Sequence, residues 1–120
     1  MSYDISLTHP KTHEVLEVDA KHFMQGGNYV LGGTQELWLN VTYNYAEIYY
    51  RSEIFGNRGI RILENLTGGE SIPILERAIG KLGDDVDDDY WKPTEGNAKQ
   101  ALINLLTMAK MRPDGIWEIE

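Results

Sequence analysis

The segment Glu36-Leu37-Trp38-Leu39-Asn40-Val41-Thr42-Tyr43 alternates between two kinds of side chain, and it decides the fold class. A period of two residues is typical of a β-strand that has one buried face and one polar face. The apolar face would carry Leu37, Leu39, Val41 and Tyr43. The other face would carry Trp38, Asn40, Thr42 and Asn44. We therefore predict a central strand over residues 36–43.

The region before this strand predicts an N-terminal β-hairpin. Residues 3–7 show the same alternation, residues 9–12 predict a turn around Pro10, and residues 15–18 predict a second strand. Two glycine pairs, Gly26-Gly27 and Gly32-Gly33, indicate turns or close backbone contacts. At the other end of the chain, residues 116–119 predict a short closing strand.

The region after residue 43 predicts helices. Asn44 is a candidate N-cap for a short helix, Ser71 for a second helix that stops at Gly83, and Thr94 for a third. The third helix has the clearest pattern, with apolar residues Ala98, Leu102, Leu105, Leu106 and Ala109 at helical spacing. Strands cluster early and helices late, which favours a single α+β domain over residues 1–120, with the helices packed on one face of a small antiparallel sheet.

Composition excludes several classes of function. The 120 residues contain 11 Lys and Arg and 19 Asp and Glu, a net charge of −8, which disfavours direct binding of nucleic acid or of an anionic membrane. The absence of cysteine excludes disulfides, zinc–thiolate sites and thiol nucleophiles. No signal peptide or membrane-spanning segment is evident, so we expect a cytoplasmic protein. His9, His13 and His22 form no recognisable constellation, so we expect no catalytic residue, metal or cofactor.

The segment 84–95 concentrates the negative charge. Its six acidic residues and one lysine give a net charge of −5. A calcium loop would need glycine at Tyr90 and glutamate at Gly96, so the match is poor. We predict a partner-binding surface made of Asp84, Asp85, Asp87, Asp88, Asp89, Tyr90 and Trp91. Two alternatives are a solvated or helix-capping loop, and internal pairing with Arg51, Arg58 and Arg61.

The polar face of the 36–43 strand is the other candidate surface. A tryptophan ring with amides and a hydroxyl has the chemistry of a small polar-ligand site. The alternative ligand-binding set is Trp38, Asn40, Thr42, Asn44 and Tyr45. The interpretation that we favour is an ordinary sheet face, with Trp38 covered by the helices that follow Asn44.

Two stretches carry a resemblance to known proteins. The first is Gly32-Gly33-Thr34 with Glu36 and residues 38–45, and the second is residues 89–99 with Pro113-Asp114-Gly115-Ile116-Trp117. Together they resemble a group of small uncharacterised proteins found in bacteriophages and prophage-like elements. The resemblance implies no activity and no catalytic residue. It implies a context in which small proteins act by binding a host protein or a host signal molecule.

These observations favour a binding protein over an enzyme. The first hypothesis is a phage-type accessory protein whose acidic surface occludes a host protein that has a basic surface, such as a nucleic-acid-binding or defence protein. The alternative is a binder of a small polar ligand or nucleotide signal at the Trp38 face. A hydrolytic enzyme built on histidine and carboxylates is the third hypothesis.

Overall fold

A computed structural model describes all 120 residues, Met1–Glu120. The strands are β1 (Ser2–Thr8), β2 (Glu17–His22), β3 (Thr34–Glu36), β4 (Trp38–Thr42) and β5 (Ile116–Ile119). The helices are α1 (Ala46–Tyr49), α2 (Gly68–Lys81) and α3 (Glu95–Met111), with two 3-10 turns, η1 (Tyr43–Tyr45) and η2 (Gly59–Leu63). The predicted α+β class is confirmed. None of the helices combines the length and the apolar character needed to cross a bilayer.

The main sheet has three antiparallel strands in the order β4-β1-β5. Ile5 of β1 pairs with Leu39 of β4 on one side and with Ile119 of β5 on the other, so β1 occupies the centre. The predicted strand 36–43 differs in this respect, because β4 lies at an edge. The segment divides at Leu37, where the chain passes from a two-stranded sheet, formed by β2 and β3, into the main sheet.

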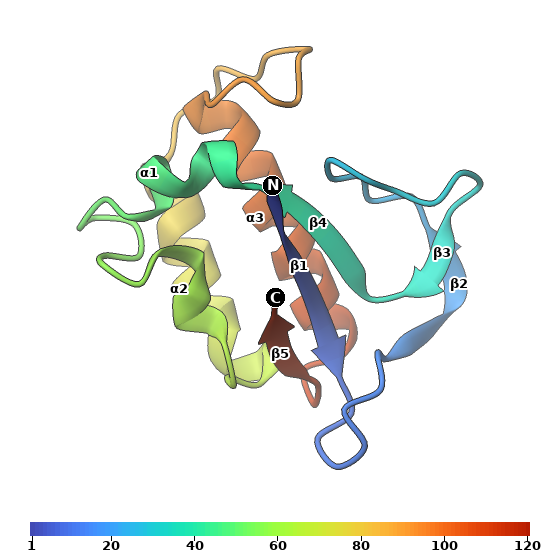
Figure 1. Cartoon of the computed structure of the whole chain (residues 1–120). Coiled ribbons are helices and arrows are strands. Elements are labelled where there is room, and N and C mark those ends of the chain that lie inside the picture. Colours follow the sequence, from blue (N-terminus) through green and yellow to red (C-terminus); the bar gives the residue numbers. More distant parts are fainter.

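The predicted N-terminal hairpin is present but short. Val15 forms a bridge with Thr8, and the N–H of Leu16 donates to the carbonyl of Leu7 at 2.9 Å. The chain then leaves β1, and β2 pairs with β3, so the second hairpin strand belongs mostly to the smaller sheet. Figure 1 shows this β2–β3 ribbon to one side of the main sheet.

The helices α2 and α3 pack against each other and cover one face of the main sheet (Figure 1). That face carries fully or almost fully buried side chains from all three strands: Ile5, Leu7, Leu39, Val41, Trp117 and Ile119. Each large apolar side chain buried there contributes about 1.5–3 kcal/mol. Trp38 lies on the opposite face and is half-buried, so the expectation that helices cover it is wrong. The strand pleat decides this, because Leu39 and Val41 take the helix-facing side.

Two of the predicted N-caps are wrong, and one is confirmed. Thr67 caps α2 and forms a capping box with Glu70. Ser71 lies inside the helix, fully buried, where its Oγ accepts a hydrogen bond from the Trp117 indole at 2.8 Å. Thr42, two residues before the predicted Asn44, caps η1. Thr94 accepts from the N–H of Asn97 at 3.0 Å and caps α3 as predicted.

The glycine pair Gly26-Gly27 covers the open edge of β4. The N–H of Gly27 donates to the carbonyl of Asn40 at 3.2 Å, and a Cβ on Gly26 would overlap that same carbonyl oxygen. An unpaired strand edge is a site of unwanted pairing, so this contact also protects β4. Gly32 and Gly33 adopt φ values of 84° and 85° and form the turn before β3.

Replacing Gly26 tests the close contact at this edge. We expect Gly26→Ala to lower the free energy of unfolding by at least about 1–3 kcal/mol, since the Asn40 carbonyl cannot move aside without losing its hydrogen bond. Gly80→Ala is the control, because a Cβ at this exposed position in α2 meets open space. It should stabilise the protein by about 0.5–1 kcal/mol. Urea unfolding of both variants measures the difference, and equal stabilities would contradict the packing described here.

Candidate functional site

Residues 82–94 connect α2 to α3 and are called the acidic loop below. Figure 1 shows this loop at the end of the molecule where α3 begins. Tyr90 attaches the loop to the sheet, because its hydroxyl donates to the carbonyl of Asn40 at 3.2 Å and accepts from the N–H of Thr42 at 3.1 Å. The hydroxyl of Tyr45 donates to the carbonyl of Tyr90 itself. The two tyrosine rings meet edge to face with their centroids 5.6 Å apart.

The protonation state of Tyr90 suits this bridging role. Burial raises the pKa of its phenol, although the hydrogen bond from the Thr42 N–H opposes the shift. The hydroxyl therefore keeps its proton and can donate to the Asn40 carbonyl while it accepts from Thr42. Burial also raises the pKa of Tyr45, which favours the protonated hydroxyl that donates to the Tyr90 carbonyl.

A second attachment comes from the first turn of α3. The Asn97 side chain accepts from the N–H of Asp87 at 2.9 Å and donates to the carbonyls of Asp89 and Lys92, both at 3.0 Å. Asp85 accepts from the N–H of Gly96 at 3.0 Å, and a Cβ on Gly96 would overlap the loop backbone. The loop is therefore fixed from both sides, by the sheet and by the helix.

Three of the six carboxylates in this region have a cationic partner. The pairs are Asp84 with Lys99 at 2.6 Å, Asp87 with Lys92 at 3.3 Å and Glu95 with Arg51 at 2.7 Å. Asp85 and Asp89 accept backbone N–H groups instead, and the Asp88 carboxylate makes no hydrogen bond or ion pair within the protein.

The alternative of internal pairing with the three arginines holds for Arg51 alone. Arg61 pairs with Glu64, and Arg58 donates to the Arg61 carbonyl. The hydrogen bond from Arg51, followed by one from the Gly83 N–H, lowers the pKa of Glu95. The N–H of Asp89, followed by Lys92, lowers the pKa of Asp87. Both groups are therefore stabilised in their charged form.

The five residues of the predicted ligand face do not form one site. Asn40 is buried, and its side chain accepts from the Asn28 N–H and donates to Ser2 and Asp4. Thr42 is buried and caps η1. Asn44 donates to the carbonyl of Trp91 at 2.8 Å. These polar groups are used inside the protein, while Trp38 lies apart on the outer face of the sheet.

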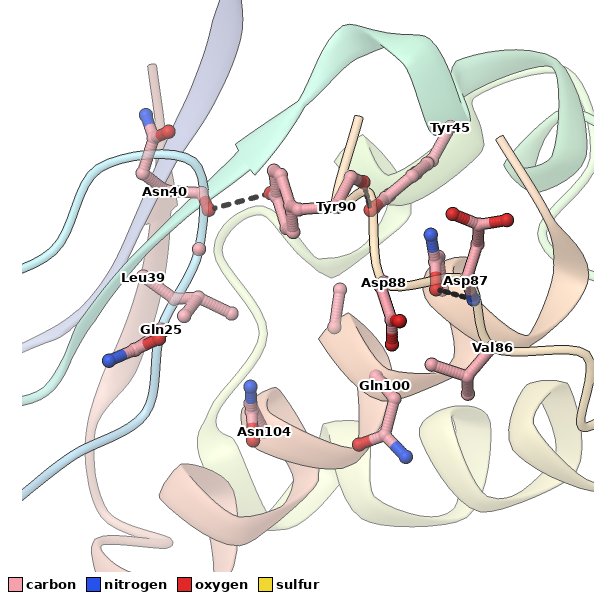
Figure 2. A pocket seen from close by; sticks show the side chains of 13 residues that line it. Gln25, Leu39, Asn40, Tyr45, Val86, Asp87, Asp88, Tyr90, Gln100 and Asn104 are labelled. Atoms are coloured by element: carbon pink, nitrogen blue, oxygen red, sulfur yellow. Dashed lines mark hydrogen bonds between the residues drawn. The ribbon is translucent and has the colours of Figure 1, made fainter. Parts of the chain in front are cut away.

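A cavity of about 170 Å³ brings members of both predicted surfaces together. It lies between Gln25-Gly26, β4, the acidic loop and α3 (Figure 2). Asn40 and Tyr45 of the predicted ligand face line it, together with Asp87, Asp88 and Tyr90 of the predicted partner surface. Its apolar lining is Leu39, Tyr45, Val86, Tyr90 and Ala101. Trp38, Thr42 and Asn44 take no part in it.

Four polar side chains around this cavity make no hydrogen bond within the protein, and all but the last are exposed to solvent: Gln25, Asp88, Gln100 and Asn104 (Figure 2). Sequence reasoning missed the three carboxamides. Gln100 and Asn104 are four residues apart on α3 and so share one face of the helix, a spacing that the sequence already contained. No lysine, arginine or histidine lines the cavity. This chemistry suits a planar, hydrogen-bonding group that is neutral or positively charged.

The three histidines lie in separate places. His9 accepts backbone N–H groups in its own turn, His13 pairs with Glu118 at 3.2 Å, and His22 contacts the Glu36 carbonyl. No group of three or more histidine or acidic side chains is arranged to hold a metal ion.

Comparison of the chain with protein-family models, with curated proteins and with solved structures finds no match. The functional interpretation therefore depends on the geometry of the site.

Removing the Tyr90 hydroxyl tests the attachment of the acidic loop to β4. We expect Tyr90→Phe to lower the free energy of unfolding by about 1–3 kcal/mol, because the Thr42 N–H loses its acceptor. Tyr29→Phe is the matched control, since Tyr29 is exposed and its hydroxyl makes no hydrogen bond. The control should change stability by less than about 0.5 kcal/mol. Chemical unfolding measures the free energy of unfolding of both variants. If Tyr90→Phe is as stable as Tyr29→Phe, the hydroxyl does not attach the loop to β4.

Proposed function

We propose that this protein acts by binding a protein partner with a positively charged surface, and that the acidic loop is the binding surface. The observation that carries the proposal is that several carboxylates of the loop have no cationic partner within the protein. Asp85, Asp88 and Asp89 have no cationic partner, and Asp88 has no hydrogen-bonding partner of any kind within the protein. Charges left unpaired on a fixed surface steer and orient an oppositely charged partner.

Exposed apolar side chains beside these charges support a protein partner. Val86 is 56% exposed and Trp91 is 47% exposed, one on each side of the Asp87–Asp89 run. Tryptophan is enriched at protein interfaces, where its ring gives a large contact area. The Trp91 ring packs edge to face on Tyr90 with a centroid distance of 5.0 Å, and it lies against Gly27. An interface residue that is already ordered loses less conformational entropy when it binds.

If the chain is a phage protein, as we expect from its sequence alone, the partner is a protein of the host cell. Carboxylates on a fixed loop can occupy positions that phosphates take on a basic surface. A host protein that binds nucleic acid, including a defence protein, is therefore the class of partner that we propose. Occlusion of its basic surface would be the biochemical effect, and no catalytic step is required.

A second candidate function is the binding of a small polar ligand. The unpaired carboxamides of Gln25, Gln100 and Asn104 favour it. The ligand site that we consider is therefore the cavity and no longer the Trp38 face. A ligand with phosphate groups is disfavoured there, because the cavity lining has two carboxylates, Asp87 and Asp88, and no cation.

A charge-matched pair of variants tests the acidic loop. The probe is a hexa-arginine peptide, titrated at low and at high salt. We expect Asp88→Asn to weaken binding about 2–5-fold at low salt, the effect of losing one exposed charge contact, and to flatten the salt dependence. Glu76→Gln removes one exposed charge from α2, and should leave the affinity nearly unchanged. Equal weakening by both variants would mean that only net charge matters, which would contradict the proposed surface.

A further inference from the structure

We infer that the cavity beside the acidic loop receives the guanidinium group of an arginine side chain from the partner. The inference rests on the proposed function and names the residue that the partner would insert. It depends on three properties of the cavity: its size, its lack of cations and its unpaired hydrogen-bonding groups.

The size fits one side chain. A cavity of about 150 Å³ is known to hold one benzene-sized ring. The volume here is about 170 Å³, whereas sites for drug-sized ligands begin at about 300 Å³. A nucleotide is too large to be enclosed, and its phosphates would meet Asp88. A flat group at the end of a flexible stem matches both the volume and the open mouth.

The unpaired groups fit a guanidinium. Arginine has five N–H donors in one plane and no acceptor, so its site must supply acceptors from several directions. Asp88 supplies a carboxylate from the acidic loop, Gln100 and Asn104 supply amide oxygens from α3, and Gln25 supplies a third amide oxygen from the segment beside β4 (Figure 2). No group in the protein donates a hydrogen bond to these oxygens, and they are open to solvent, because every buried side-chain polar atom has a partner.

The apolar lining fits the stem of the same side chain. Arginine lays its methylene groups along apolar surface while its charged head meets polar groups. Leu39 and Ala101 form the apolar part between β4 and α3, and Val86 stands at the exposed side. Lysine would offer one compact ammonium, which is more strongly hydrated and has three donors against the five of arginine.

A titration with two isosteric probes tests this assignment. The probes are Nα-acetyl-arginine amide and Nα-acetyl-citrulline amide, which have nearly the same shape but differ in charge. We expect the arginine probe to bind at least about tenfold more tightly, because only the guanidinium carries a positive charge and can form an ion pair with Asp88. The side-chain NH₂ signals of Gln100 and Asn104 should shift during an NMR titration. Equal affinities, or tighter binding of cytosine used as a neutral planar probe, would overturn the assignment.

Variants on α3 separate this inference from the proposed function. Asn104→Ala and Gln100→Ala should each weaken binding of the arginine probe and of the hexa-arginine peptide about threefold or more. Asn57→Ala removes an exposed carboxamide that makes no hydrogen bond, and should have no effect. If Asp88→Asn weakens peptide binding and the two α3 variants do not, the acidic loop binds the partner without the cavity and the inference is wrong. If none of them changes peptide binding, the proposed function fails as well.

Discussion

The hydroxyl group of Tyr90 is the contact on which the site depends. It bridges two backbone groups of β4, the carbonyl of Asn40 and the N–H of Thr42. The Asn40 carbonyl also accepts the N–H of Gly27, so the edge of β4 is completed from two sides at one residue. The acidic loop and the Gly26-Gly27 segment consequently lie beside each other, and the cavity is the space that remains between them and α3. Without this bridge, the loop would lose its direct hydrogen bonds to β4 and keep those from Tyr45, Asn44 and α3.

Fixing six carboxylates in one short region requires compensation for their mutual repulsion. Three are compensated by Lys92, Lys99 and Arg51, and two by backbone N–H groups. Hydrogen bonds to N–H groups stabilise a carboxylate without neutralising it, so the loop remains negative while its backbone is ordered. Asp88 is exposed and has no partner within the protein, so a cation on a binding partner is attracted most strongly to its carboxylate. This separation between structural and available charges supports the proposal of a binding surface.

Local patterns in the sequence predicted where strands and helices lie. They did not predict which elements and residues lie next to one another in the fold. The alternation in residues 3–7 and the cap at Thr94 are local features, and both are confirmed. Ser71 was misassigned because Thr67 and Glu70 form a competing capping box four residues earlier. The edge position of β4 could not be predicted, because strand order depends on pairing with β1 and β5. Asn40 appeared available for a ligand, but its partners Ser2, Asp4 and Asn28 lie 12 or more residues away in sequence. The cavity could not be predicted either, because it is formed by segments far apart in the sequence. Only the spacing of Gln100 and Asn104, which places them on one face of α3, could be seen in the sequence.

The central claim is that the acidic loop is ordered before any partner binds, and amide hydrogen exchange of the free protein tests it most directly. The N–H groups of Asp87 and Gly96 are hydrogen-bonded to Asn97 and Asp85, whereas the N–H of Asp88 between them in sequence has no partner. We expect Asp87 and Gly96 to exchange at least about a hundredfold more slowly than Asp88, since their exchange requires local opening of the loop. Exchange of all three at the rate of an unstructured peptide would contradict the account.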